Sequence, residues 1–299
     1  MIARKSKDDR IFDSVNIILL VLILIIVLYP LYFIIIASFS DPLEVLAGKV
    51  FLLPKKINVE AYKMVFRDES IVTGYRNTIL YTILGTAINI VMTILAAYPL
   101  SRKDFVGRGF FTLMMAITMF FSGGLIPTYL LISNTLHMQD TIWAMVLPGA
   151  VSVWNTVIMR TYFQTSIPEG LHEAAVVDGC SSTKLLLKIV LPLSKPVIAV
   201  LVLFYGVGHW NSFFNALIYL SDKDKYPLQL ILRNILVQNN VDFTAIDKMG
   251  SITDMMQKQY LSELLKYSLI VVSSIPLLIF YPFIQKYFIK GVMVGSIKG

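Results

Sequence analysis

The run SVNIILLVLILIIVLYPLYFIIIASFS, residues 14–40, contains no Asp, Glu, Lys or Arg and decides the class of fold. Roughly 20 apolar residues in a helix cross the roughly 30 Å hydrocarbon core of a bilayer, so this run is long enough to span it. Five further runs also lack these four residue types: 77–101, 109–136, 141–159, 196–221 and 267–285. None alternates apolar and polar residues as barrel strands do. The sequence therefore predicts an all-α integral membrane protein with about six transmembrane helices, formed by residues 1–299 as a single domain.

The composition agrees with this class of protein. Of 299 residues, 56% are apolar and only 15% are charged, whereas soluble domains carry roughly 25% charged residues. The first run is too long for the apolar part of a signal peptide, so we expect a retained span. Lys and Arg are mildly enriched in the segments that face the cytoplasm when both termini lie there. We read the net charge of +7 as a topology signal and expect no nucleic-acid partner.

The sequence shows no pattern typical of a metal site, an internal disulfide or a nucleotide-binding site. A single cysteine, Cys180, excludes an internal disulfide, and His137, His172 and His209 do not have metal-ligand spacing. No glycine-rich phosphate loop occurs, so we expect no cofactor bound by this chain and no catalysis by it. The apolar runs hold no carboxylate, which argues against an ion-coupled secondary transporter. A membrane scaffold or channel that does not transport a solute is another alternative.

The longest predicted cytoplasmic stretch, residues 166–193, reads SIPEGLHEAAVVDGCSSTKLLLKIVLPL. Ser166 followed by Glu169 has the spacing of a capping box, which predicts a helix start. Gly179 stands where a left-handed residue ends a helix, and the residues 181–183 can cap a second helix from Lys184 to Leu191. The stretch therefore predicts a helix, a tight turn and a second helix, either as an ordinary capped loop or as a knob that docks into a groove of another protein.

The same stretch resembles the EAA loop of the permeases of ATP-binding-cassette (ABC) importers. The match consists of Glu173-Ala174-Ala175, Asp178-Gly179 and, after nine residues, Ile189 and Leu191-Pro192. The resemblance implies a type I ABC importer permease, in which this loop sits in a cleft of a cytoplasmic ATPase. It makes Glu173, Ala174, Ala175, Asp178 and Gly179 the ATPase-coupling residues and places ATP and magnesium on the partner chain.

Further partners follow from the same resemblance. They are a cytoplasmic ATPase dimer, a second permease subunit, an extracytoplasmic solute-binding protein and the lipid bilayer. The resemblance also implies a bacterial plasma membrane, crossed several times, with both termini in the cytoplasm.

Other segments narrow the class of solute. The stretch LPKKINVEAYKMVF, residues 53–66, resembles the outer loop of carbohydrate-importer permeases of the maltose type. Residues 121–129, FSGGLIPTY, are similar to an oligosaccharide subgroup often labelled LplC-like, and Trp210-Asn211 and the closing run 285–299 look like the same family. The resemblance implies import of a carbohydrate, with a non-sugar solute as the alternative.

Sugars present hydroxyls and apolar ring faces, so amides and aromatic rings are the expected lining of a pathway. The candidates within the spans are Asn89, Tyr98, Tyr129, Asn155, Trp210 and Asn211. Each of these residues has an alternative structural role, either as an anchor at the membrane interface or in a hydrogen bond between helices.

Other residues in the spans predict local structure. For His209 we favour a neutral, packed or pathway-lining role, and Gly123, Gly124 and Pro127 predict a break in the third span. Amphipathic stripes further predict short helices near residues 59–66 and 228–235.

Overall fold

The computed structural model describes residues 7–239 and 252–296, and every regular element in these ranges is helical. The chain divides into two compact units. Unit 1 comprises Met1–Asp68 with Asn234–Ile275, and unit 2 comprises Glu69–Arg233 with Pro276–Gly299. The single-domain organisation of residues 1–299 stays a prediction.

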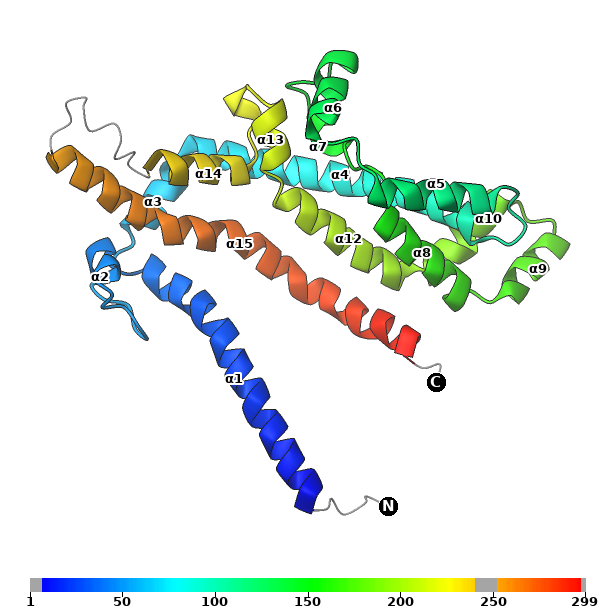
Figure 1. The fold of residues 1–299 in the computed structure, drawn as a ribbon, viewed down its shortest axis with the longest axis horizontal. Helices are drawn as coiled ribbons and strands as arrows, with labels where there is room; N and C mark the ends of the chain where they lie inside the picture. The colour runs from blue at the N-terminus through cyan, green and yellow to red at the C-terminus, as the bar shows by residue number, and fades with distance from the viewer. Residues whose placement is uncertain (1–6, 240–251, 297–299) are drawn as a thin grey trace. The chain divides into compact units, whose positions relative to one another are not determined.

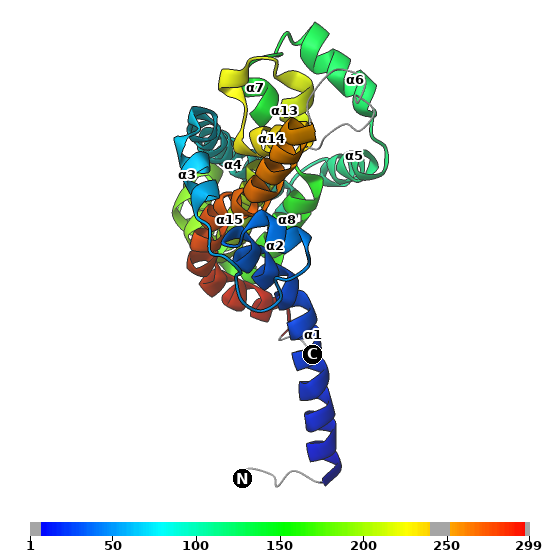
Figure 2. The same ribbon diagram turned by 90° about the vertical axis from the view of Figure 1, so that its left-hand side faces the viewer.

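Unit 1 is built on one long apolar helix. The helix α1 (Lys7–Ser38) buries only the residues of its last turn, Ile36, Ala37 and Ser38. There it is followed by α2 (Pro42–Leu46) and α3 (Glu60–Arg67), and Figure 2 shows α2 beside this end of α1. The Phe39 ring stacks on Tyr62 at 5.0 Å between centroids. The rest of α1 therefore presents an apolar exterior of the kind that lipid covers.

The predicted short helix at residues 59–66 is α3. Ala61 and Val65 are fully buried, whereas Phe66 is 67% exposed. The predicted stripe at 228–235 lies on α14 (Leu228–Asn239), and there Leu228, Ile231 and Leu232 are buried as expected.

Unit 2 is organised around α4 (Glu69–Ser101), against which α8 (Val153–Ser166) and α12 (Lys195–Trp210) pack (Figure 1). Small residues on α4 allow this close approach, as is common between membrane helices. The Thr93 hydroxyl lies 2.7 Å from the Tyr205 hydroxyl of α12. The core below them contains Ala97, Met159 and Leu201, all fully buried.

The remaining elements of unit 2 are short. They are α5 (Arg108–Phe120), α6 (Leu125–Leu130), a π-helical turn (Leu131–Thr135), α7 (Ile142–Val146), α9 (Glu169–Val177), α10 (Ser182–Leu185), a second π-helical turn (Leu186–Val190), α11 (Leu191–Leu193), α13 (Phe214–Tyr219) and a 3₁₀ turn (Lys223–Lys225). The last helix, α15 (Ile252–Ser296), begins in unit 1 and ends in unit 2.

Three of the six predicted apolar runs are not continuous helices. The run 109–136 bends by 112° between α5 and the next helix, at the predicted glycine pair, where Gly124 has φ +86°. The run 141–159 is split into α7 and α8, because Pro148 and Gly149, with φ +84°, interrupt the helix. The run 196–221 is interrupted after Trp210 and resumes as α13.

Length and composition within the described ranges yield three helices that can cross a membrane singly: Lys7–Ser38, Glu69–Ser101 and Ser262–Pro282. Two bent pairs raise the number to five if each is one span. Neither α7 nor α8 alone has the length of a full span, so the bounds of the span predicted at 141–159 stay a prediction.

Candidate functional site

The stretch 166–193 forms the predicted helix, turn and second helix. The first helix, α9, ends in a Schellman motif: Gly179 adopts φ +67°, its N–H donates to the Val176 carbonyl at 3.0 Å, and the Cys180 N–H donates to the Ala175 carbonyl at 2.8 Å. The Ser181 side chain then caps α10 by accepting the Lys184 N–H at 3.4 Å. The turn is therefore fixed by backbone geometry on one side and by a side-chain cap on the other.

The predicted capping box at the start of this stretch is wrong. Ser166 is the last residue of α8, and Pro168 precedes α9 without a side-chain cap. Glu169 instead accepts a hydrogen bond from Lys103 Nζ at 2.6 Å, in the loop between α4 and α5. The carboxylate thus joins two segments rather than closing its own helix, because a partner 66 residues earlier in the chain competes for it.

Neighbouring charges and burial shift the pKa values of several groups around α9. The Lys103 ammonium holds the pKa of Glu169 below its usual range, and Arg102, hydrogen-bonded at 3.0 Å, lowers the pKa of Asp104 in the same way. Burial lowers the pKa of His172 on α9, with a smaller contribution from Arg102. The first turn of α9 is therefore tied to the α4–α5 loop by one charge pair, Lys103–Glu169, which water partly screens.

The predicted coupling residues divide between the core and the surface. Ala175 is buried against Leu185 and Val190, and it joins α9 to the core of unit 2. Glu173, Ala174, Asp178 and Gly179 are exposed. Two apolar neighbours that the sequence analysis did not single out, Val176 and Val177, are 64% and 87% exposed. The result is an exposed helix end with two apolar side chains and two carboxylates, which suits insertion into a groove of another protein.

Asn89 lies in the interior of unit 2 and is 1% exposed. Its amide nitrogen donates to the carbonyls of Gly149 and Ala150 at 2.8 and 3.0 Å. These carbonyls lie in the break before α8, where a continuous helix would have satisfied them. The amide oxygen lies 2.7 Å from His209 Nε2 on α12. In this conformation Asn89 joins three segments rather than facing a cavity.

His209 packs closely on a glycine of α4. A Cβ added at Gly85 would lie 2.4 Å from the imidazole ring, so only glycine admits the ring at this position. The packed role expected for His209 agrees with this geometry.

The other pathway candidates are placed apart. Tyr98 packs edge-on against Phe163 beneath residues 166–193, which we call the coupling stretch, and Trp210 is 5% exposed. Asn155 lies buried in the first turn of α8, where its backbone N–H donates to Ser152 Oγ. Tyr129 stacks on Tyr219 at 5.9 Å, and Asn211 is exposed, with its amide donating to the Val207 carbonyl. The six residues do not share one surface in this conformation.

A polar network at the other end of α4 was missed by the sequence analysis. The Asn77 amide donates to the carbonyls of Asp224 and Tyr226, and the Tyr81 hydroxyl donates to that of Lys225. Asp140 accepts the backbone N–H groups of residues 221 and 222 at 2.6 and 3.0 Å. The helical spacing of Asn77, Thr78 and Tyr81 on α4 was the available signal, because it places polar groups on one face.

Comparison with known proteins decides the family. Residues 70–294 match the family described as the inner membrane component of binding-protein-dependent transport systems. The chain belongs to this family. It is a non-catalytic, multi-pass membrane permease component of an ABC transporter, as the EAA-loop resemblance implied.

Relatives cover nearly the whole chain. The chain is 39% identical to protein LplC of Bacillus subtilis, over 98% of this chain and 97% of LplC. It is 38% identical to the polygalacturonan/rhamnogalacturonan transport system permease protein YtcP of the same organism, over 97% of this chain and 99% of YtcP. A crystal structure of a bacterial ABC transporter involved in the import of the acidic polysaccharide alginate matches with a TM-score of 0.83 and 35% identity, over 95% of this chain and 99% of that one. The fold is that of a type I ABC importer permease.

Proposed function

We propose that this permease passes an oligosaccharide, delivered by an extracytoplasmic binding protein, across the bacterial plasma membrane. The named transport substrates of the relatives support a carbohydrate: polygalacturonan or rhamnogalacturonan for YtcP and alginate for the transporter of known structure. Both include acidic glycans, so uronic-acid oligosaccharides are the first substrates to test. Arabinooligosaccharides and galactooligosaccharides, named for more distant relatives, are the neutral comparison.

The proposal assigns ATP hydrolysis to a separate cytoplasmic ATPase dimer, which holds ATP and magnesium, and assigns this chain no cofactor. It pairs the chain with a second permease subunit, and it places both termini in the cytoplasm. With this orientation the exposed end of α9 faces the ATPase.

The single observation that carries the coupling role is the rigid, exposed end of α9. The Schellman turn at Gly179 fixes its shape, and the buried Ala175 and the Lys103–Glu169 pair connect it to unit 2. A movement of the ATPase that displaces α9 would therefore also displace the segments packed against it, and so favour an outward-facing arrangement. Glu173, Ala174, Ala175, Asp178 and Gly179 are its coupling residues in this proposal.

For the solute pathway we retain Tyr129 and Asn211, which have exposed surface here. Asn89, Tyr98, Asn155 and Trp210 are buried, so they would line a pathway only in a conformation in which the helices around them separate.

The test is a pair of matched substitutions. Val177 lies at the end of α9 and is 87% exposed, and Val106 lies in the neighbouring α4–α5 loop and is 91% exposed. In the importer purified with its partner chains, Val177→Asp should remove most of the ATPase activity that a loaded binding protein stimulates, because it places a charge in an apolar contact. Val106→Asp should retain that activity.

Comparable losses in both variants would contradict a specific docking role for α9. Stimulation by acidic or neutral oligosaccharides would identify the class of solute. Solute uptake driven by an ion gradient, without any associated ATPase, would overturn the importer proposal.

A further inference from the structure

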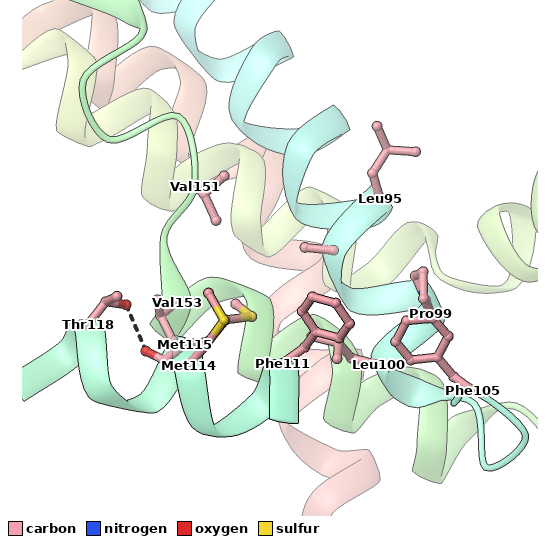
Figure 3. Close-up of a pocket in the computed structure, with 11 residues that line it drawn as sticks. Leu95, Pro99, Leu100, Phe105, Phe111, Met114, Met115, Thr118, Val151 and Val153 are labelled. Atoms are coloured by element: carbon pink, nitrogen blue, oxygen red, sulfur yellow. Dashed lines mark hydrogen bonds between the residues drawn. The ribbon is translucent and has the colours of Figure 1, made fainter. Parts of the chain in front are cut away.

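An apolar cavity of about 410 Å³ opens in unit 2 between α4, α5 and the break before α8 (Figure 3). Its lining residues are Leu95, Ala96, Pro99, Leu100, Phe105, Phe111, Met114, Met115, Thr118, Val151 and Val153. The one hydroxyl among them, Thr118 Oγ1, already donates to the Met115 carbonyl at 2.8 Å. The wall thus offers hydrocarbon contact and little else, which suits an acyl chain and not a sugar.

Two arginines mark the end of this cavity nearest the coupling stretch. Arg108 is the first residue of α5, one turn before Phe111. Arg160 lies two turns after Val153 on α8, which puts it on the same face and about 10 Å further along the helix. Arg160 Nη1 donates across to Thr112 Oγ1 of α5 at 3.5 Å. The Arg160 guanidinium therefore lies where α5 and α8 meet, and Arg108 stands one turn before Thr112 on α5.

The positive charge at this point lacks a counter-ion among the described residues. Arg160 Nε is buried and has no hydrogen-bond partner there. The nearby carboxylates of Asp104 and Glu169 are already paired with Arg102 and Lys103. Burial, together with the neighbouring charge of Arg108, lowers the pKa of Arg160. A partly buried guanidinium beside a second cation is costly unless an anion accompanies it.

We propose that this site binds one anionic phospholipid, with an acyl chain in the apolar cavity and its phosphate between Arg108 and Arg160. The two features fit one molecule, because the arginines lie at the end of the two predicted apolar runs, 109–136 and 141–159, where lipid headgroups are expected. Guanidinium groups bind phosphate oxygens through charge-assisted hydrogen bonds. A helix of a second permease would satisfy both features only if it brought a carboxylate to the arginines, and the chain purified alone would then show no preference for an anionic lipid.

Phe105, which lines the cavity, follows Lys103 of the Lys103–Glu169 pair by two residues in the same loop. A bound lipid would join α5 to α8 next to the coupling stretch, so occupancy is expected to influence how firmly that stretch is held.

The experiment is native mass spectrometry of the purified full-length chain with phosphatidylglycerol or phosphatidylcholine added. Wild type should retain one phosphatidylglycerol in preference to phosphatidylcholine. The double variant Arg108→Gln, Arg160→Gln should weaken this retention by about tenfold or more, because both charge-assisted contacts are lost. The control Arg67→Gln, Arg76→Gln removes the same charge from two exposed arginines elsewhere and should bind as wild type does.

A second variant keeps both arginines and fills the cavity. Met115→Trp should displace the long-chain lipid while leaving the thermal unfolding of the lipid-free chain close to that of wild type. Equal retention of the two lipids by wild type, a loss of equal size in the control variant, or full retention by Met115→Trp would overturn the proposal. Displacement of the lipid by millimolar inorganic phosphate would also overturn it, since it would show a phosphate site that does not need the chain.

Discussion

Replacing Gly179 by alanine isolates the contribution of backbone conformation to the turn after α9. Gly179 has φ +67°, and an added Cβ would meet nothing within 4 Å, so steric clash is absent and only backbone strain remains. A left-handed conformation costs a non-glycine residue about 1–2 kcal/mol, which changes the ratio of closed to open turn by about 5- to 30-fold. Asparagine tolerates this conformation better, so Gly179→Asn should fall between wild type and Gly179→Ala.

Amide hydrogen exchange measures this directly. The N–H groups of residues 179 and 180 close the turn, so their exchange should accelerate by about the same 5- to 30-fold in Gly179→Ala. Gly170→Ala is the matched control, because its added Cβ also meets nothing within 4 Å and its φ lies outside the left-handed region. Alanine there should leave α9 unchanged or stabilise it by up to about 1 kcal/mol. Equal exchange of these two amides in both variants would refute the assignment of the turn to glycine conformation.

Three further substitutions test the rest of unit 2. Asn89→Leu should destabilise the chain in detergent by several kcal/mol, because each group that loses its hydrogen bond to Asn89 costs about 1–3 kcal/mol. Thermal unfolding measures this loss, and a change within error would contradict the role of Asn89 in joining three segments. Gly85→Ala should lower the free energy of unfolding by about 1–3 kcal/mol, because the added methyl group overpacks against His209. Adding His209→Ala should restore part of this loss, and two effects that simply add would count against direct packing. Backbone N–H bonds from residues 222 and 221 lower the pKa of Asp140, so its stabilisation is present above the usual value of 3.8 and is lost as pH falls through the lowered value. Asp140→Asn should flatten this acid dependence, and an unchanged pH profile of thermal unfolding would argue against the contribution.

Local patterns in the sequence predicted part of the fold because their causes are local. Long charge-free runs predicted the apolar helices, and Gly123-Gly124 predicted the bend after α5. The glycine after Asp178 and the serine at 181 predicted both sides of the turn in the coupling stretch. Pro148-Gly149 carried an equally clear signal for the break before α8, but the surrounding apolar residues made one continuous span the simpler prediction.

The candidate site was less predictable, because its contacts join distant segments. Glu169 has the local spacing of a capping box, yet its carboxylate pairs with Lys103. Asn89 was expected to face a pathway, yet its three polar contacts are to residues 60 or more positions away in the sequence. A single sequence records which polar groups need partners and not which distant partner each will find.

The central claim is that the end of α9 contacts the ATPase, and site-specific cross-linking in native membranes tests it most directly. Cys180→Ser removes the single native cysteine, and Val177→Cys or Val106→Cys then places one thiol either at the exposed end of α9 or in the exposed α4–α5 loop. A short thiol-to-amine cross-linker should join residue 177 to a nucleotide-binding chain, with a yield that changes when ATP is added, and should give little such product from residue 106. Equal yields from both positions, or no ATPase product from residue 177 in an actively transporting membrane, would contradict the account.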